Sequence, residues 1–299
     1  KFKNIFYSIM RKISTWLGDT KIRNRDPSNY NGQTLIDLKA AIQMENKLVP
    51  GDVMISRTDW FLSNVFLPGF WMHSFIYIGN EEKLKNYFND KAVNDYYKNK
   101  CEQIGKGCHS FFGFLTSSDK TSKAIKAYLQ KDKYGFEKVL IEGTSDGIHF
   151  SSIKHTFLND YLAAMRPVLN KLAKAKSIEA AIENFGLEYD FDFDYLTDDR
   201  LVCSELVAKA YAKDRFKAGF DVNYSIEKKK YLEISVGRLA LPVKNFVYKT
   251  YDENVLKLRA AEIKFVAFLK GDKKRKKSSF VSEKEFYKSR EYPKWEFMR

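Results

Sequence analysis

A cysteine at the start of a predicted helix is the feature that most constrains this chain. Residues 201–207 read LVCSELV, and Cys203 follows the cap-type residues 197–199. Apolar residues then recur at helical spacing as far as Ala210, so we expect the helix to begin close to the cysteine. Unpaired N–H groups and the helix dipole at that end favour a thiolate over a thiol. Cys203 is therefore either a nucleophile or a small buried hydrophobic residue.

Two polar residues at the ends of predicted strands are candidates to act with this cysteine. His73 begins the segment HSFIYIG, which is rich in the aromatic and β-branched residues typical of a strand. Glu142 interrupts the apolar end of a second strand, VLIEG. A histidine and a glutamate on neighbouring strands can both face a cysteine on a helix packed against that sheet, as nucleophilic catalysis requires. The alternatives are a partly buried histidine without chemistry and a surface carboxylate.

Six segments together resemble the permuted papain-like cysteine hydrolases of the NlpC-type superfamily, the YiiX/YaeF-like group. They are PGDVMISR, HSFIYIG, VLIEG, YLAAMRP, EYDFDFD and LVCSELVAKAY, and the resemblance spans about residues 49–211. In unpermuted relatives the cysteine helix precedes the histidine strand, whereas here the order is histidine, acidic residue, cysteine. The resemblance implies that Cys203 is the nucleophile, His73 the general base and Glu142 the residue that orients the imidazole.

The resemblance also implies an α+β, circularly permuted papain-like fold, with an antiparallel sheet or barrel packed on the nucleophile helix. We expect a helical N-terminal extension over residues 1–48 and the catalytic domain over 49–215. A C-terminal extension over 216–299 is expected to pack on the same core. The catalytic domain contains a lysine-rich, mostly helical insertion at about 81–137, which is longer than a hairpin needs. We expect this insertion to act as a cap or lid.

The remaining elements are predicted from apolar periodicity and turn residues. A Pro-Gly-Asp turn at 50–52 is expected to lead into a strand. Helices are predicted over 34–45, 177–184 and 255–269, and strands over 138–143, 147–154, 160–166, 232–236, 239–243 and 246–248.

An aromatic stretch and a tyrosine, each preceding a predicted catalytic residue, are candidates for the substrate site. Residues 60–71 are rich in aromatic side chains and end at Trp71, which we expect to help wall the cleft. The resemblance matches Tyr189, in EYDFDFD, to a tyrosine that lies near the thiol in relatives. With Arg57, at the end of PGDVMISR, these residues form the predicted substrate-binding set.

The formal net charge of +14 predicts contact with polyanions, such as nucleic acid, anionic lipid or an anionic cell-wall polymer. None of the usual nucleic-acid-binding motifs is present, so specific nucleic-acid binding is not expected. The densest basic run, 273–277, is expected to be an exposed loop. The amphipathic residues 1–20 either pack on the core or lie on an anionic membrane surface. No apolar run is long enough to span a membrane.

We expect neither a metal nor another cofactor. The acidic residues that alternate over 190–194 are similar to the start of a calcium loop. However, Tyr195 stands where that loop needs glycine and Leu201 where it needs glutamate. Cys101 and Cys108 are spaced for a small disulfide loop, and the sequence does not decide whether they form one. With the histidine after Cys108 they lack a fourth metal ligand at a useful spacing.

The function implied by the resemblance is hydrolysis of an amide through a thiol. The implied substrate is a cell-wall peptide or a related γ-D-glutamyl or amino-acid amide. Two alternatives remain: a lipid-directed thiol acyltransferase or lipase on the same scaffold, and a non-catalytic binding module for an anionic polymer. The resemblance favours a location in the bacterial cell envelope, in the periplasm or outside the cell, and the oligomeric state stays open.

Overall fold

The computed structural model describes residues 34–59, 70–191, 199–212, 225–231, 234–240 and 263–293. Several predictions fall outside these residues. They include the helix at 1–20, residues 60–69 of the aromatic stretch, the acidic positions 192 and 194, the cap-type residues 197–198, residues 241–243 of a predicted strand, the strand at 246–248 and residues 255–262 of the predicted helix.

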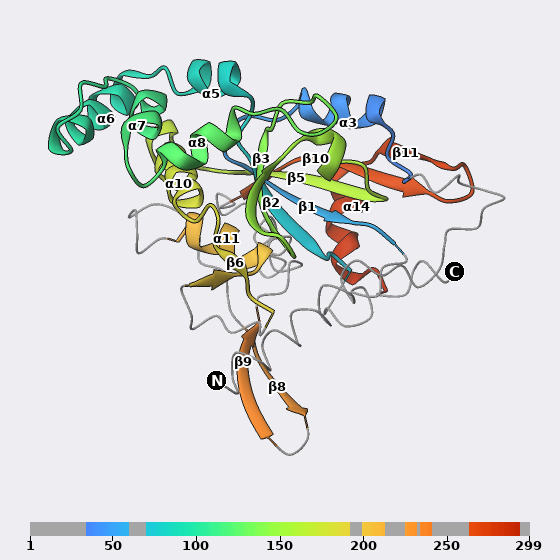
Figure 1. Ribbon diagram of the computed structural model, residues 1–299. Coiled ribbons are helices and arrows are strands. Elements are labelled where there is room, and N and C mark those ends of the chain that lie inside the picture. Colours follow the sequence, from blue (N-terminus) through green and yellow to red (C-terminus); the bar gives the residue numbers. More distant parts are fainter. Residues whose placement is uncertain are drawn as a thin grey trace, which may run out of the picture.

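A seven-stranded antiparallel sheet forms the centre of the protein (Figure 1). The strand order is β11-β10-β5-β1-β2-β3-β4, and every neighbouring pair is antiparallel. Because β11 and β4 are its two edges, the sheet is open rather than a barrel. In chain order the strands are β1 (Asp52–Arg57), β2 (His73–Tyr77), β3 (Leu140–Thr144), β4 (Gly147–Ser151), β5 (Tyr161–Pro167), β10 (Ile263–Asp272) and β11 (Lys277–Phe280).

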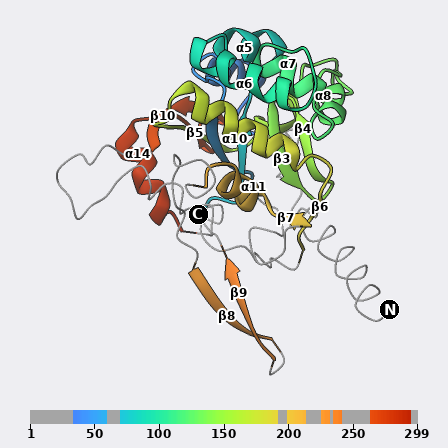
Figure 2. The ribbon, with the colours of Figure 1, turned by 90° about the vertical axis from the view of Figure 1, so that its left-hand side faces the viewer.

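Helices cover both faces of this sheet (Figures 1 and 2). One face packs against α10 (Lys171–Glu183), α11 (Cys203–Ala210) and α14 (Glu283–Lys288). The opposite face packs against α3 (Leu38–Glu45) and α9 (Ile153–Thr156). The smaller elements are the parallel pair β6 (Glu188–Tyr189) and β7 (Arg200–Leu201), the hairpin of β8 (Ser225–Tyr231) and β9 (Ile234–Ala240), and the 3-10 turn η1 (Ser289–Glu291).

Alternation along the central strand β1 explains the two-sided core. Val53 and Ile55 belong to the apolar cluster on the α10 and α11 side, whereas Met54 belongs to the cluster on the α3 side. All six residues of β1 are buried, as expected for a strand covered on both faces. The strand follows the predicted turn, in which Gly51 has φ +90°, a conformation that glycine adopts readily.

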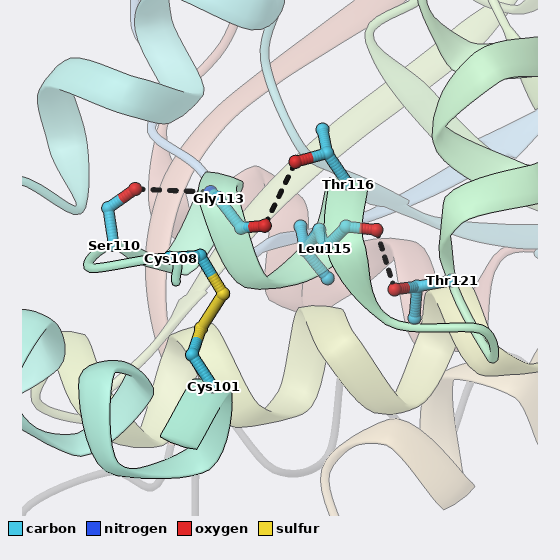
Figure 3. Close-up of a disulfide and its surroundings, with 7 residues drawn as sticks. All are labelled: Cys101, Cys108, Ser110, Gly113, Leu115, Thr116 and Thr121. Carbon is cyan, nitrogen blue, oxygen red and sulfur yellow. Dashed lines mark hydrogen bonds between the residues drawn. A yellow bond between two sulfur atoms is a disulfide. The ribbon is translucent and has the colours of Figure 1, made fainter. Parts of the chain in front are cut away.

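The segment between β2 and β3 contains four helices, as predicted for the insertion: α5 (Glu81–Tyr87), α6 (Lys91–Gln103), α7 (Phe111–Ser117) and α8 (Ser122–Tyr128). Cys101 of α6 and Cys108 form a disulfide (Figure 3). The Ser110 hydroxyl accepts from the Gly113 N–H at 3.1 Å and caps α7. The disulfide and the cap together hold α7 against the end of α6.

The insertion docks on α10. The Glu179 carboxylate of α10 accepts hydrogen bonds from the Tyr97 hydroxyl at 2.7 Å and from the Lys100 ammonium. Both views place α10 between the insertion and α11 (Figures 1 and 2). The insertion follows the C-terminal end of β2, while His73 begins that strand. This position does not match a lid over Cys203.

Three predicted elements differ from the structure. Residues 263–269 lie in strand β10 rather than in a helix, because this apolar run pairs with β5 along its length. Helix α10 begins at Lys171 rather than at 177, since the Asn170 side chain caps it by accepting from the Ala173 N–H at 2.8 Å. In the C-terminal region the strands of the hairpin span 225–231 (β8) and 234–240 (β9), whereas strands are predicted over 232–236 and 239–243.

The basic run 273–277 forms the turn between β10 and β11 and the start of β11. Within the described parts of the chain, none of the helices combines the length and the apolar content that a membrane span requires.

Candidate active site

Cys203 is the first residue of α11, as the sequence predicts. Val202 is the N-cap residue in an extended conformation, and the Glu205 carboxylate accepts a hydrogen bond from its N–H at 3.3 Å. Glu205 is the third helical residue, so this bond is the half of a capping box that fixes where the helix begins. The N-cap position therefore lies at Val202 and not at the polar residues predicted as caps. No helix carbonyl can accept the N–H of Cys203, because it lies in the first turn.

The thiol lies where two strands of the sheet separate. β2 pairs with β1 from Tyr77 to His73, but with β3 only as far as Phe75 opposite Glu142. Beyond that point β3 no longer pairs with β2, and the backbone N–H of Ser74 helps to lower the pKa of the Cys203 thiol. Helix α11 packs against both strands and brings the cysteine into this opening.

Gly143 allows the close contact between β3 and the start of α11. A Cβ at this position would lie 2.8 Å from Cδ1 of Ile148, and 3.5 Å from both N and Cα of Cys203. The distances to Cys203 are ordinary van der Waals contacts, so a side chain at this position would have to displace Ile148. The glycine that follows Glu142 in the sequence thus lies against the start of the nucleophile helix.

The three side chains predicted to be catalytic interact with one another. His73 Nε2 lies 2.7 Å from Glu142 Oε2. The Cys203 thiol is the other group that acts on the imidazole, and the two shift each other's pKa. Because Nε2 is engaged by the carboxylate, Nδ1 is the ring nitrogen left for the sulfur.

Glu142 is itself held by a shell of partners that the sequence predictions missed. Its side chain is 2% exposed, and its second oxygen accepts from the Thr156 hydroxyl at 2.6 Å. His149 and His155 approach the same oxygen to 3.8 and 3.9 Å, so three of the chain's four histidines surround one carboxylate. His149 lies directly opposite Glu142 on β4, a position that the hairpin turn at 144–147 sets.

The charges of the site follow from these contacts. Burial disfavours a charged imidazole, but the hydrogen bonds to Cys203 and Glu142 outweigh burial and raise the pKa of His73 to about 10. Burial likewise opposes the charge on Glu142, and the hydrogen bond and charge of His73 overcome it and lower the pKa of that carboxyl to about 2. The pKa of the Cys203 thiol is lowered against burial by His73 and by the hydrogen bonds from Ser74.

These directions favour a thiolate–imidazolium pair at neutral pH, which is the nucleophilic form of a cysteine. Cys203 is 6% exposed, while 24% of the His73 side chain is exposed. The pair therefore meets solvent on the side of the imidazole.

Two of the predicted substrate-binding residues lie in the core. Arg57 is 1% exposed; its guanidinium donates to Asp59 at 2.7 Å and to the Phe70 carbonyl at 2.6 Å. Trp71 is 1% exposed as well, and its indole N–H donates to the Ser289 hydroxyl at 3.0 Å. Trp71 packs against Phe268 of β10 and Phe286 of α14, and the Arg57 guanidinium lies over the Phe70 ring, so both side chains have core contacts.

Tyr189 is the member of that set that lies near the nucleophile. It is half-buried on β6, and the parallel pairing with β7 places it beside Leu201, which precedes Cys203 by two residues. Its ring centroid lies 5.1 Å from that of Phe191. Among the described residues, no group of three or more histidine, cysteine, aspartate or glutamate side chains is arranged to hold a metal ion.

Comparison with known protein families agrees with this geometry. Residues 47–223 match the family model described as the permuted papain-like amidase enzyme, YaeF/YiiX, C92 family. The chain belongs to this family. The match spans His73, Glu142 and Cys203, and it confirms the predicted permuted papain-like α+β fold and the class of cysteine amidase or peptidase. No curated protein and no solved structure matched the chain.

Proposed function

We propose that this C92-family enzyme hydrolyses an amide bond with Cys203 as the nucleophile. His73 acts as the general acid and base, and Glu142 orients the imidazole and holds its positive charge. The observation that supports the proposal is that His73, bonded at 2.7 Å to the buried Glu142 carboxylate, also interacts with the Cys203 thiol at the start of α11. The three residues thus have the order of nucleophile, base and orienting residue that thiol hydrolases need.

In the first half of the reaction, the Cys203 thiolate attacks the carbonyl carbon of the amide. The developing oxyanion is stabilised by the N–H of Cys203, which no helix carbonyl accepts, and by the positive end of the α11 dipole. The C–N bond then breaks, and the His73 imidazolium gives its proton to the departing amine. The products of this half are a thioester on Cys203, a neutral imidazole and a free amine.

In the second half, water replaces the amine. Neutral His73 takes a proton from water as the oxygen attacks the thioester carbonyl. The C–S bond breaks, the acid is released and the thiolate–imidazolium pair returns. Throughout, Glu142 accepts the hydrogen bond from Nε2, so that Nδ1 keeps facing the sulfur and the substrate.

For the substrate we propose a small peptide or amino-acid amide that carries carboxylates, such as a cell-wall peptide. The net charge of +14 supports an anionic substrate or an anionic cell-envelope surface as partner, because such a field raises the local concentration of anions. Tyr189, close to the nucleophile helix, is the proposed substrate contact.

We further propose that the enzyme works outside the reducing cytoplasm. The disulfide between Cys101 and Cys108 supports this location, since disulfides persist mainly in oxidising compartments. Cys203 is not part of the disulfide and is a free cysteine, so the nucleophile does not depend on that bridge.

The proposal is tested by incubating the purified protein with muropeptides and, separately, with phospholipid vesicles. We expect mass spectrometry to show new amine and acid ends from the muropeptides, and no turnover by Cys203→Ala. Ser177→Ala is the matched control, because this fully buried serine of α10 bonds only the Ala173 carbonyl in its own helix. Fatty-acid release without peptide cleavage overturns the amide assignment. Equal turnover by wild type and Cys203→Ala overturns the nucleophile.

A further inference from the structure

Lys174 is a buried lysine that the proposed reaction does not use. It lies near the start of α10 and is 3% exposed. Its ammonium donates to the Tyr87 hydroxyl of α5 at 3.3 Å, and within the described residues it makes neither another hydrogen bond nor an ion pair. Burial of a charged group is costly unless the group is paired with an opposite charge. The position of Lys174 therefore needs an explanation beyond packing.

The carboxylate that acts most on this lysine, Asp52, is already paired. Its oxygens accept hydrogen bonds from Nε and Nη2 of Arg166, both at 2.8 Å, and Oδ2 also accepts the Val49 N–H at 2.9 Å. Burial lowers the pKa of the Lys174 ammonium to about 8, Asp52 acts against this shift, and Arg166 adds to it. Because the charges of Asp52 and Arg166 balance each other, the charge of Lys174 stays uncompensated.

A second ammonium and a phenol add further hydrogen-bond donors at the same place. Lys171 Nζ and Lys174 Nζ lie 5.3 and 5.8 Å from the centroid of the Tyr87 ring. The Tyr87 oxygen accepts from Lys174, so its own hydrogen is left to donate, and the described residues offer it no acceptor. The first turn of α10 contains no acidic residue, although the helix dipole favours anions there. The cluster thus combines donors and positive charge with no acceptor.

We propose that Lys171, Lys174 and the Tyr87 hydroxyl form a binding site for a phosphate group. Phosphate oxygens accept strong hydrogen bonds from ammonium and hydroxyl donors. A phosphate dianion also balances both ammonium charges, whereas a carboxylate leaves one of them uncompensated. The positive end of the α10 dipole adds to the attraction.

This site is separate from the active site. Lys174 packs on Gly51, just before β1, because its Cδ lies 3.2 Å from the position of a Cβ on that glycine. His73 lies opposite Ser56, near the other end of β1. Binding of phosphate here does not depend on the proposed reaction, so either proposal can fail without the other.

The test is isothermal titration calorimetry of the purified protein with inorganic phosphate, near neutral pH and at constant ionic strength. We expect saturable binding by the wild type and an affinity at least about tenfold lower in Lys174→Met, because hydrogen bonds from a charged donor are lost. Methionine keeps most of the aliphatic chain that packs on Gly51.

Lys176→Met is the matched control. It removes the same charge from the same helix, but Lys176 Nζ lies over the Tyr96 ring, 4.0 Å from its centroid, and not at Tyr87. We expect this variant to bind phosphate with wild-type affinity. A general effect of net charge lowers the affinity equally in both variants and overturns the site.

Thermal unfolding tests the same site through stability. Lys174→Met removes a buried charge without a counter-charge, so its melting temperature in phosphate-free buffer is not expected to fall. At a phosphate concentration of about ten times Kd, the wild type should melt about 2–4 °C higher and the variant should not respond. If Lys174→Met does not fold, Tyr87→Phe removes only the hydroxyl and should weaken phosphate binding about three- to tenfold.

The remaining outcomes decide the ligand. Absence of saturable phosphate binding by the wild type, or equal affinity in the wild type and Lys174→Met, overturns the site. Tighter binding of acetate than of phosphate overturns the assignment to a phosphate group. Glycerol 3-phosphate distinguishes the sources of that group: tighter binding than inorganic phosphate supports an organic phosphate as the ligand, and weaker binding supports the free ion.

Discussion

His73 Nε2 lies 2.7 Å from Glu142 Oε2, and this bond determines which ring nitrogen is left for Cys203. The two residues are 69 positions apart, and the sheet brings them together because β2 and β3 are neighbouring antiparallel strands. The second carboxylate oxygen is occupied by Thr156, so Glu142 has little freedom to rotate. The imidazole is thereby aimed at the sulfur before any substrate arrives.

Glu142→Gln is expected to narrow the pH range of activity from both sides. The amide keeps an acceptor for Nε2 but removes the charge that helps to raise the pKa of His73 to about 10. The pKa of His73 then falls and that of Cys203 rises, so the thiolate–imidazolium pair exists over fewer pH units. We expect kcat/KM at neutral pH to drop on the order of a hundredfold.

Measured pH–rate profiles of the wild type and this variant check the narrowing. Thr156→Val is the graded control, since it removes one hydrogen bond from Glu142 but leaves the charge in place. If activity of Glu142→Gln falls off at high pH at the same point as in the wild type, the charge of Glu142 does not raise the pKa of His73.

The lowered pKa of Glu142 also predicts how the stability of the fold depends on pH. Its pKa is about 2 in the folded protein and 4.5 as the ordinary value, so it contributes stability that is present above pH 4.5. That contribution is lost as the pH falls from 4.5 towards 2. Thermal unfolding of Glu142→Gln is therefore expected to depend less on pH in this window than unfolding of the wild type. If the melting temperatures of the two proteins change equally with pH in this window, Glu142 is not the source of the acid sensitivity.

Glu205 is expected to act with the opposite sign. Burial raises the pKa of its carboxyl to about 7, against the ordinary 4.5, although Lys209 at 3.4 Å partly opposes this. Its contribution to stability is full below pH 4.5 and is lost as the pH rises through 7. Glu205→Gln keeps an acceptor for the Val202 N–H and never ionises. The melting temperature of the variant minus that of the wild type should increase from pH 4.5 to pH 7. A difference that stays constant over this range argues against the raised pKa of Glu205.

Gly143→Ala is expected to damage both stability and activity. The new Cβ meets Cδ1 of Ile148 at 2.8 Å and lies beside the backbone of Cys203. Overpacking of this kind costs about 1–3 kcal/mol, and here the Ile148 side chain must give way next to the start of the nucleophile helix. Adding Ile148→Val removes the atom that clashes, so the double variant should regain part of the alkylation rate of Cys203. If it regains none, displacement of the helix rather than the clash with Ile148 limits the site.

Removal of the disulfide is expected to affect stability without affecting the thiol. Cys101 and Cys108 are separated by 7 residues, and closing a loop of this size contributes about 2–3 kcal/mol in the chain-entropy treatment. The variant Cys101→Ala with Cys108→Ala should unfold at a lower temperature. The insertion follows the C-terminal end of β2, whereas His73 lies at the N-terminal end. The rate at which iodoacetamide alkylates Cys203 in the variant should therefore match the wild-type rate. A slower rate shows that the insertion positions the site.

Local sequence patterns were sufficient for some parts of the site. Cys203 was placed at a helix start because apolar spacing shows where the helix begins, and His73 at a strand start because β-branched and aromatic residues follow it. The cap was not recognised, since Glu205 acts from inside the helix on the N–H of Val202. Valine stands at the N-cap, where the Ser-x-x-Glu pattern of a capping box has serine or threonine, so the pattern gave no signal.

The sequence by itself determined which residue types stand at the ends of the helix and strands, because propensity and periodicity are properties of neighbouring residues. Tertiary structure alone decided their partners. It buried Arg57 against Phe70 and Trp71 against Phe268 and Phe286, and it made a strand of residues 263–269. Strand register and helix packing join positions far apart in the chain, and only there do Ser74 and Gly143 gain their place beside the thiol.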